Sequence, residues 1–176
     1  IRGKVDVVFA TSTPLTIAIP GIIQKYRKSA PLVFEVRDLW PEMPIAMGAL
    51  RNPMARFLAR SLEWIAYQSA QQIVALSPGM AEGVVRGGGK RAKVSVIPNA
   101  CDLDLFQIAP DIGRSFRREV LGFDEGAPLL VYAGTFGHVN GVGYAIEVAR
   151  HLQQRGAKTK IILVGAGVEK PLVMDL

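Results

Sequence analysis

The sequence predicts an α/β protein built from parallel sheets, on two observations. Apolar runs rich in β-branched residues recur along the chain, and segments with helical periodicity lie between them. The runs are continuous rather than alternating, which is typical of parallel strands buried on both faces. Strands and helices that alternate in this way predict right-handed crossovers. The six predicted strands cover residues 5–11, 31–36, 72–77, 93–98, 128–134 and 159–165.

Two of the intervening segments have a clear helical pattern. Residues 53–69 follow Asn52, and Pro53 suits the first position of a helix. This helix has an apolar face and a charged face with Arg56, Arg60 and Glu63. The apolar face comprises Met54, Phe57, Leu58, Leu62, Ile65 and Ala66. A second helix is predicted over residues 141–155, and the last residues of the chain begin another.

The composition changes near residue 102, which predicts two domains. Residues 1–102 carry 13 Lys and Arg against 7 Asp and Glu, a net charge of +6, whereas residues 103–176 carry 8 of each. The stretch from Pro98 to Gly113 is rich in turn formers and has no sustained period. We therefore predict one α/β domain over 1–102, a linker over 103–112 and the start of a second domain over 113–176. The first domain has four predicted strands and the second has two, so we expect each domain to be incomplete.

The basic first half has two interpretations that stay open at this point. An excess of positive charge indicates an anionic partner such as nucleic acid, lipid headgroups or a phosphorylated substrate. It is equally typical of a solvated surface rich in lysine and arginine. The single cysteine, Cys101, excludes an intramolecular disulfide. No apolar stretch is long enough to cross a membrane and no secretory signal is recognisable, so we expect a soluble or peripheral protein.

Ligands of open α/β sheets bind beyond the carboxyl ends of strands, which directs attention to the loop GTFGHVNG. Its glycines, Gly134, Gly137 and Gly141, allow a ligand to approach the backbone closely. The helix after the loop directs its free N–H groups toward it, as a diphosphate site requires. The spacing is not GxGxxG, so a dinucleotide-dependent dehydrogenase is not expected. The alternative is that the glycines serve tight turn geometry alone.

The loop RDLWPE, after the second predicted strand, combines a cation, two carboxylates and an aromatic ring. Arg37 can hold an anionic group, while Asp38 or Glu42 can accept a proton or a sugar hydroxyl. The ring of Trp40 can stack on a sugar or a base. The alternative is an ion pair between Arg37 and Asp38 with Trp40 packed beneath it.

Other signatures of catalytic chemistry are missing. The only histidines are His138 and His151, and there is no HExxH or CxxC, so no metal site is predicted. His151 falls late in a predicted helix, where a surface position is expected. GxSxG and GxxxxGK[ST] are also missing, which leaves no support for a hydrolase elbow or a Walker phosphate loop.

Four segments in this order, FEVRDLWPE, VIPNACDLDLF, LVYAGTFGHVNGVGYAIEVA and ILVGAG, resemble family-4 (group 1) glycosyltransferases of the GT-B fold. The resemblance is closer to the bacterial branch that builds surface polysaccharides and includes amino-sugar transferases. It implies two Rossmann-like domains facing each other over a cleft, the first for the acceptor and the second for a nucleotide-sugar, usually UDP-linked. It implies no cofactor beyond this donor substrate.

The resemblance also assigns roles to residues. Asp38 is the implied catalytic residue, at the place where many relatives carry a histidine near the reacting sugar. Asn99 and Asp102 fall at the crossover between the domains. The implied acceptor-binding residues are Arg37, Trp40 and Glu42. The implied donor-binding residues are Asn99, Gly134, Thr135, Phe136, Gly137, His138, Asn140, Gly141 and Gly165.

Two departures from the family pattern matter. Many relatives carry an Arg and a Lys in the donor loop, and this chain has Asn140 where the Lys falls, so charge compensation must come from backbone N–H groups, His138 or elsewhere. The glycine-rich loop that opens the family's first domain and the late glutamate pair that binds the donor are not found in the 176 residues. We therefore expect a fragment of a larger transferase that is inactive by itself.

The sequence thus predicts part of a retaining glycosyltransferase that uses a nucleotide-sugar and a lipid-pyrophosphate or saccharide acceptor. We expect it to be cytoplasmic, at the inner face of the plasma membrane, where its basic half meets an anionic surface. One alternative is a non-catalytic nucleotide- or sugar-binding module. Nucleic-acid binding rests on the charge alone and lacks an RRM-type aromatic motif, so it ranks last.

Overall fold

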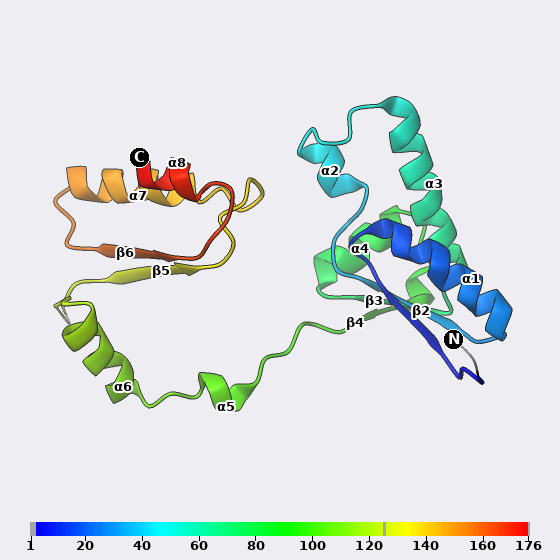
Figure 1. Ribbon diagram of the computed structural model, residues 1–176, viewed down its shortest axis with the longest axis horizontal. Coiled ribbons are helices and arrows are strands. Elements are labelled where there is room, and N and C mark those ends of the chain that lie inside the picture. Colours follow the sequence, from blue (N-terminus) through cyan, green and yellow to red (C-terminus); the bar gives the residue numbers. More distant parts are fainter. Residues whose placement is uncertain (1–2, 125, 176) are drawn as a thin grey trace. The chain divides into compact units, whose positions relative to one another are not determined.

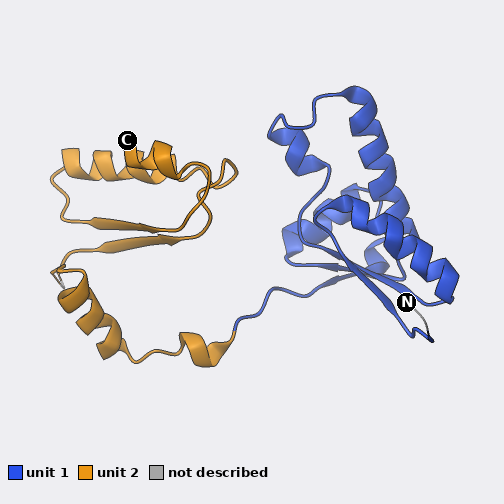
Figure 2. Cartoon of the chain, in the orientation of Figure 1, with its two compact units in different colours: residues 1–101 blue, residues 102–176 orange. Residues whose placement is uncertain are grey.

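The computed structural model describes residues 3–124 and 126–175, which form two compact units, residues 1–101 and 102–176 (Figures 1 and 2). All six predicted strands are present, each slightly shorter than predicted. Both sheets are parallel, with neighbouring strands joined through helical connections. The prediction of an α/β protein with parallel sheets is therefore confirmed.

Unit 1 contains a four-stranded sheet in the order β1-β2-β3-β4. Its strands are β1 (Val8–Thr11), β2 (Leu32–Val36), β3 (Gln72–Ala75) and β4 (Val94–Val96). Its helices are α1 (Ala18–Lys28), α2 (Glu42–Ala46), α3 (Pro53–Ser69) and α4 (Pro78–Arg86). Two short 3-10 turns, η1 (Leu15–Ile17) and η2 (Arg91–Lys93), complete it.

Side-chain caps explain where α3 and α4 begin. The Asn52 side chain accepts hydrogen bonds from the backbone N–H groups of Met54 and Ala55, and proline follows the cap. Ser77 caps α4 in the same way, by accepting from the N–H of Met80. Each cap satisfies N–H groups that have no partner inside the helix and typically contributes about 1 kcal/mol. The predicted limits of α3, residues 53 and 69, are confirmed.

The helices of unit 1 lie on one face of its sheet (Figure 1), as right-handed crossovers between successive parallel strands require. Beneath them, Leu32, Phe34 and Val36 of β2 are almost fully buried. Side chains on the other face are less covered, and Phe9 of β1 is 59% exposed. In β3, by contrast, Ile73, Val74 and Ala75 are all buried. Within the described part of this unit, the prediction of strands buried on both faces therefore holds for β3 but not for β1, β2 and β4.

The orientation of α3 also differs from the prediction. Its buried residues are Ala66 and Tyr67, with Leu62 packed against the core beside them. Of the six apolar side chains expected to face the core, Leu62 and Ala66 do so, whereas the other four are exposed, together with Trp64. The exposed set is Met54, Phe57, Leu58, Trp64 and Ile65. Small Ala66 and the ring of Tyr67, which meets Phe34 edge to face, suit the close approach of helix to sheet.

Unit 2 contains two parallel strands, β5 (Leu129–Ala133) and β6 (Lys160–Val164), and the helices α7 (Gly143–Gln154) and α8 (Lys170–Asp175). The helix predicted over 141–155 is thus present as α7, and the helix expected at the end of the chain as α8. The segment expected as a linker, 103–112, contains α5 (Leu103–Phe106) and the beginning of α6 (Pro110–Ser115). A π-helical turn, η3 (Phe116–Val120), continues α6.

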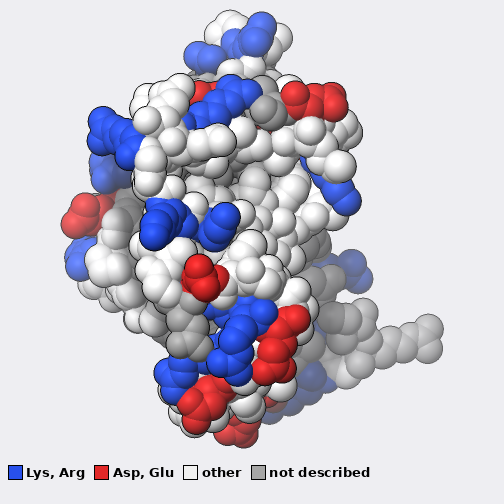
Figure 3. Space-filling view, turned by 90° about the vertical axis from the view of Figure 1, so that its left-hand side faces the viewer, with Lys and Arg blue, Asp and Glu red and all other residues white. Residues whose placement is uncertain are grey.

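Acidic and basic side chains are interspersed on the face seen in Figure 3. Arg114 pairs with Asp111 and Arg118 pairs with Glu119, which agrees with the equal numbers of both charges in the second half of the chain. His151 is exposed near the end of α7, as predicted. Among residues 3–124 and 126–175, no helix is long and apolar enough to span a bilayer.

Candidate functional site

The carboxyl ends of β1 and β2 form the first part of the site, because these strands run side by side with Thr11 opposite Glu35. Ser12 follows β1 and is buried, at 2% exposed. Its backbone N–H donates to the carbonyl of Glu35 at 2.7 Å, and its hydroxyl accepts from the backbone N–H of Arg37 at 3.1 Å. These two bonds hold the start of the RDLWPE loop against the end of β1.

The next residue along, Thr13, positions Asp38. Its hydroxyl donates to Asp38 Oδ2 at 2.7 Å. Thr13 has φ of 128°, a conformation that β-branched residues rarely adopt and that costs on the order of 1–3 kcal/mol. Strained residues of this kind persist where the surroundings hold them and are concentrated at functional sites. The Asp38 carboxylate is exposed but fixed in direction by this bond.

Arg37 joins the end of β2 to the segment after β4. Its guanidinium donates to Asn99 Oδ1 at 3.1 Å, although the two residues are far apart in the chain. In the described part of the chain, Arg37 and Asp38 form no ion pair. The alternative in which these two side chains only neutralise each other therefore does not hold. The structure therefore brings together two predicted site residues, Arg37 and Asn99, within unit 1.

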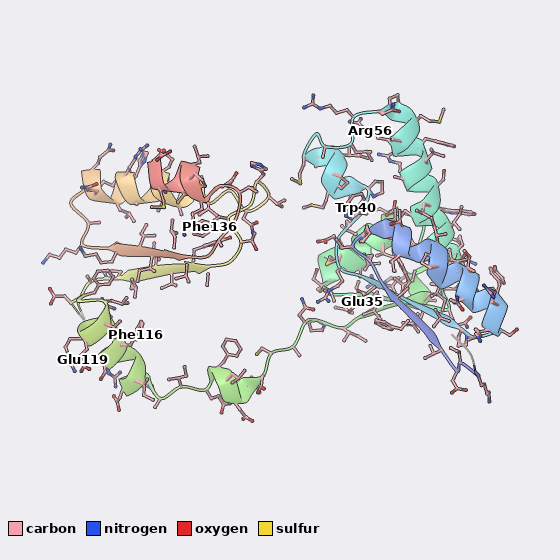
Figure 4. The ribbon with its side chains drawn as sticks, viewed as in Figure 1. Glu35, Trp40, Arg56, Phe116, Glu119 and Phe136 are labelled. Atoms are coloured by element: carbon pink, nitrogen blue, oxygen red, sulfur yellow. The ribbon has the colours of Figure 1, made fainter. Side chains whose placement is uncertain are left out.

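A cavity of about 510 Å³ opens beside Asp38, between the end of β2, α2 and the beginning of α4. Glu42 contributes a carboxylate to its wall. The cavity is lined by Arg37, Asp38, Leu39, Glu42, Met43, Ala46 and Met80. Trp40 is not among these residues, because its half-buried ring packs against the core beneath the loop (Figure 4). This placement of Trp40 matches the alternative in which the ring supports the loop.

A second hollow, of about 400 Å³, lies on the other side of Glu42 and contains the half-buried carboxyl of Glu63. The pKa of Glu63 is raised from 4.5 to about 7. Burial is the main cause and the nearby charge of Glu42 adds to it, while the hydrogen bond from Tyr67 and the charge of Arg60 act in the opposite direction. Tyr67 donates its hydroxyl to Glu63 Oε1 at 3.1 Å. Burial, followed by the charge of Glu63, raises the pKa of Tyr67.

This shift predicts that stability depends on pH through Glu63. A carboxyl whose pKa is raised in the folded state binds more protons there than when unfolded, so the free energy of unfolding falls as pH rises from 4.5 to about 7. Glu63→Gln should remove this fall and be more stable than the parent at pH 8. Because water screens the half-buried carboxyl, we expect the free energies of unfolding of the two proteins to differ by about 1–2 kcal/mol at pH 8. Urea unfolding of both proteins at pH 5 and pH 8 measures this difference. If the stability of Glu63→Gln depends on pH as strongly as that of the parent, the prediction is contradicted.

In unit 2, two glycine-containing loops meet at the carboxyl edge of the two-stranded sheet. The N–H of Gly134 donates to Val164, and the N–H of Phe136 donates to Ala166, both at 2.9 Å. A third bond of 2.9 Å runs from the N–H of Glu169 to the carbonyl of Phe136. The loop GTFGHVNG before α7 and the segment GAG after β6 therefore form one continuous backbone surface.

Glycine is required at Gly165 because the two loops approach so closely. A Cβ built there would lie 1.9 Å from the carbonyl oxygen of Gly134 and 2.8 Å from the Phe136 ring. At Gly167, which has φ of 154°, a Cβ would lie 2.3 Å from the carbonyl oxygen of Phe136. The Phe136 side chain is only 4% exposed and stacks at a tilt on Tyr132 (Figure 4). Phe136 thus supports the loop from within.

The other predicted donor residues lie on the exposed surface of this loop. They are Gly134, Thr135, His138, Asn140 and Gly141, with Gly137 half-buried between them. Two partners were not predicted from the sequence. Glu169 Oε1 lies 2.9 Å from His138 Nδ1, and the Tyr132 hydroxyl donates to the Thr135 carbonyl at 2.9 Å. The only signal for Glu169 was its position just after GAG.

The residues of both units offer hydroxyl, carboxylate, imidazole and backbone groups. Within residues 3–124 and 126–175, no three His, Cys, Asp or Glu side chains are placed to hold a metal ion. Unit 1 can hold a polar ligand beside Asp38, and unit 2 can offer backbone N–H groups and the N-terminus of α7 to an anion.

Comparison with known proteins defines the class. The model of the glycosyl transferase 4-like domain matches residues 1–100, so the chain belongs to this glycosyltransferase family. No curated protein matches the chain.

Among solved structures, Anabaena Alr3699/HepE in complex with UDP and glucose is similar with a TM-score of 0.71 and 21% identity, over 97% of this chain and 42% of that one. The structure of the same protein with UDP has a TM-score of 0.62 and 17% identity, over 96% of this chain and 50% of that one. The structure with UDP-glucose has a TM-score of 0.57 and 18% identity, over 96% of this chain and 50% of that one. The present chain therefore spans at most half the length of these relatives. At such identities the likeness establishes the fold, and the predicted GT-B architecture is confirmed.

Proposed function

We propose that this chain is part of a retaining glycosyltransferase that moves a sugar from a UDP-linked donor to a lipid-linked or saccharide acceptor in surface-polysaccharide synthesis. The observation that carries this proposal is the pair of interlocked glycine loops at the carboxyl edge of β5 and β6, in a chain of glycosyltransferase family and fold. The similar structures of Alr3699/HepE contain UDP, UDP and glucose, or UDP-glucose, which supports the choice of donor.

The donor diphosphate would lie on the loop from Gly134 to Gly141. Its negative charge would be met by backbone N–H groups, the N-terminus of α7 and His138, since the loop contains no Lys or Arg. Glu169 would orient the His138 imidazole through their 2.9 Å contact.

The acceptor would bind in the cavity beside Asp38. Retaining transfer within this fold needs charge stabilisation on the leaving diphosphate and a positioned acceptor more than a strong protein nucleophile. Asp38 would hold the attacking hydroxyl of the acceptor, with its own direction fixed by Thr13. Arg37 and Glu42 would contact the acceptor from the cavity wall.

Titration of the 176-residue chain with UDP, ADP and duplex DNA tests the proposal. UDP should bind saturably and more tightly than ADP, and DNA should bind weakly. His138→Ala should weaken UDP binding about tenfold, the value of one charge-assisted contact of roughly 1.4 kcal/mol. His151→Ala, which replaces an exposed histidine elsewhere, should bind UDP like the parent. Tight DNA binding without any response to UDP would overturn the proposal, and UDP binding by a whole enzyme that transfers no sugar would favour the non-catalytic module.

We also propose that unit 1 meets the anionic inner face of the plasma membrane. The exposed apolar residues Met54, Phe57, Leu58 and Ile65 form a stripe on α3, which also carries Arg56. Apolar and aromatic side chains next to arginines are typical of helices that lie in the bilayer interface. The excess positive charge of the first 102 residues is complementary to anionic headgroups.

This proposal predicts salt-sensitive binding to vesicles. Vesicles of phosphatidylglycerol and phosphatidylethanolamine should bind the protein at 50 mM NaCl and lose most of it at 500 mM, because salt screens the exposed charges. Phe57→Ser with Leu58→Ser should weaken binding at both salt concentrations. Co-sedimentation measures both effects, with Ile19→Ser, an exposed apolar residue of α1, as the matched control. Binding that salt does not change would contradict the electrostatic part.

A further inference from the structure

The hollow that contains Glu63 has features of a ligand site. It lies between the beginning of α2, the middle of α3 and the end of α4, and measures about 400 Å³. Its walls are Pro41, Glu42, Arg60, Glu63, Trp64, Gly83, Arg86 and Gly87. We call this hollow the α3–α4 groove. Glu42 also lines the cavity beside Asp38, so the groove and that cavity share a wall.

Glycines at the end of α4 make room for the two central side chains of the groove. A Cβ at Gly87 would lie 2.7 Å from Glu63 Oε1, and a Cβ at Gly88 would lie 2.6 Å from Cδ1 of Trp64. Any larger residue would push the Glu63 carboxyl or the Trp64 indole from its position. Gly87 and Gly88 therefore preserve the shape of the groove.

The polar groups in the groove are only partly used by the protein itself. Glu63 accepts one hydrogen bond, from Tyr67. In the ranges 3–124 and 126–175, the side chains of Glu42, Arg60 and Arg86 form no hydrogen bond or ion pair with other residues. Two guanidinium groups and two carboxyls therefore converge on one hollow with donors and acceptors to spare.

This combination suits a saccharide ring. Hydroxyl groups of a sugar can donate to carboxylates and accept from guanidinium groups, often in pairs. The apolar C–H face of a pyranose can pack against an indole such as Trp64, which is 54% exposed. The two positive charges are nearly balanced by Glu42 and Glu63, which disfavours a highly charged ligand such as a nucleotide.

We propose that the α3–α4 groove is a second saccharide subsite, which holds the acceptor sugar unit next to the one beside Asp38. This inference rests on the proposed function, because the acceptor would extend from the cavity at Asp38 past Glu42 into the groove. The acceptor recognised by the enzyme would then carry at least two sugar units. The groove would set acceptor specificity without contacting the donor.

Nuclear magnetic resonance can test this inference with the indole N–H signals of Trp40 and Trp64, which are the only two tryptophans. Trp64→Phe assigns the two signals. The probes are methyl N-acetyl-β-glucosaminide, methyl β-glucoside and the disaccharide chitobiose, added to the 176-residue chain, with glycerol as a control for viscosity. At least one saccharide should shift the Trp64 signal saturably, and glycerol should not.

Variants of the groove sharpen the test. Arg86→Ala should weaken saccharide binding at least fivefold, whereas Arg91→Ala, an exposed arginine of η2, should leave it unchanged. The disaccharide should perturb the methyl groups of Leu39 and Met43 in the neighbouring cavity as well as Trp64. If no probe shifts the Trp64 signal, or if Arg86→Ala binds saccharide as well as the parent, the inference is overturned. UDP binding to unit 2, measured on the same samples, reports separately on the proposed function.

Discussion

Asp38→Asn is expected to lower kcat for glycosyl transfer in the whole enzyme by a factor of about 10²–10⁴, the usual contribution of a positioned acid or base. Asparagine keeps the size of the side chain and can still accept a hydrogen bond from Thr13, so the local structure should survive. What is lost is the negative charge that would attract the proton of the attacking hydroxyl. The KM for the donor should change little, because the donor diphosphate is assigned to unit 2.

Steady-state kinetics with a UDP-sugar and a saccharide or lipid-linked acceptor measure this effect. Asp6→Asn provides the matched control, since Asp6 is an exposed aspartate of the same unit and pairs with Lys4. Thr13→Val should give a smaller loss, because it leaves the Asp38 charge but removes the bond that directs it. Full activity in Asp38→Asn would exclude Asp38 from catalysis.

Gly165→Ala is expected to destabilise unit 2 by about 3 kcal/mol, near the upper end of what added atoms cost in a packed site. The new Cβ would fall 1.9 Å from the Gly134 carbonyl oxygen, and neither backbone can move without breaking bonds between the two loops. UDP binding should be lost with the loop geometry. The UDP affinity and the unfolding of unit 2, followed by hydrogen exchange of β5 and β6, measure both effects.

Gly113→Ala is the control for this substitution. It adds the same methyl group in unit 2 where nothing lies within 4 Å, and it replaces glycine inside α6. Alanine in a helix is favoured over glycine by roughly 0.5–1 kcal/mol, so this variant should be as stable as the parent or more. If Gly165→Ala and Gly113→Ala unfold alike, the close approach of the two loops is not what holds the donor site.

The elements of the fold could be predicted from the sequence because each has a local cause. The six strands follow from continuous apolar runs, and α3 follows from Asn52, Pro53 and the helical spacing. The buried face of α3 could not be predicted from that spacing. Large apolar residues surround this helix on nearly all sides, so the pattern does not single out one face, and the choice is made by close packing at Ala66 and Tyr67.

The candidate site was predictable to the level of its loops but not of its bonds. The strand-end rule selected the loops RDLWPE and GTFGHVNG, and the structure joins each of them to another loop of its own unit. The bonds that direct the side chains connect Thr13 with Asp38, Arg37 with Asn99, and His138 with Glu169. The partners are 25, 62 and 31 residues apart, and no local pattern encodes such distances.

The bond between Arg37 and Asn99 has a mechanical consequence. Asn99 lies just before the boundary between the two units, in a stretch without regular structure, and Arg37 ties it to the end of β2. Hinges in proteins of this kind are a few residues that absorb backbone rotation. Because Asn99 is anchored in this way, we expect backbone rotation near the unit boundary to begin only after it, which leaves Arg37 and the neighbouring Asp38 in place.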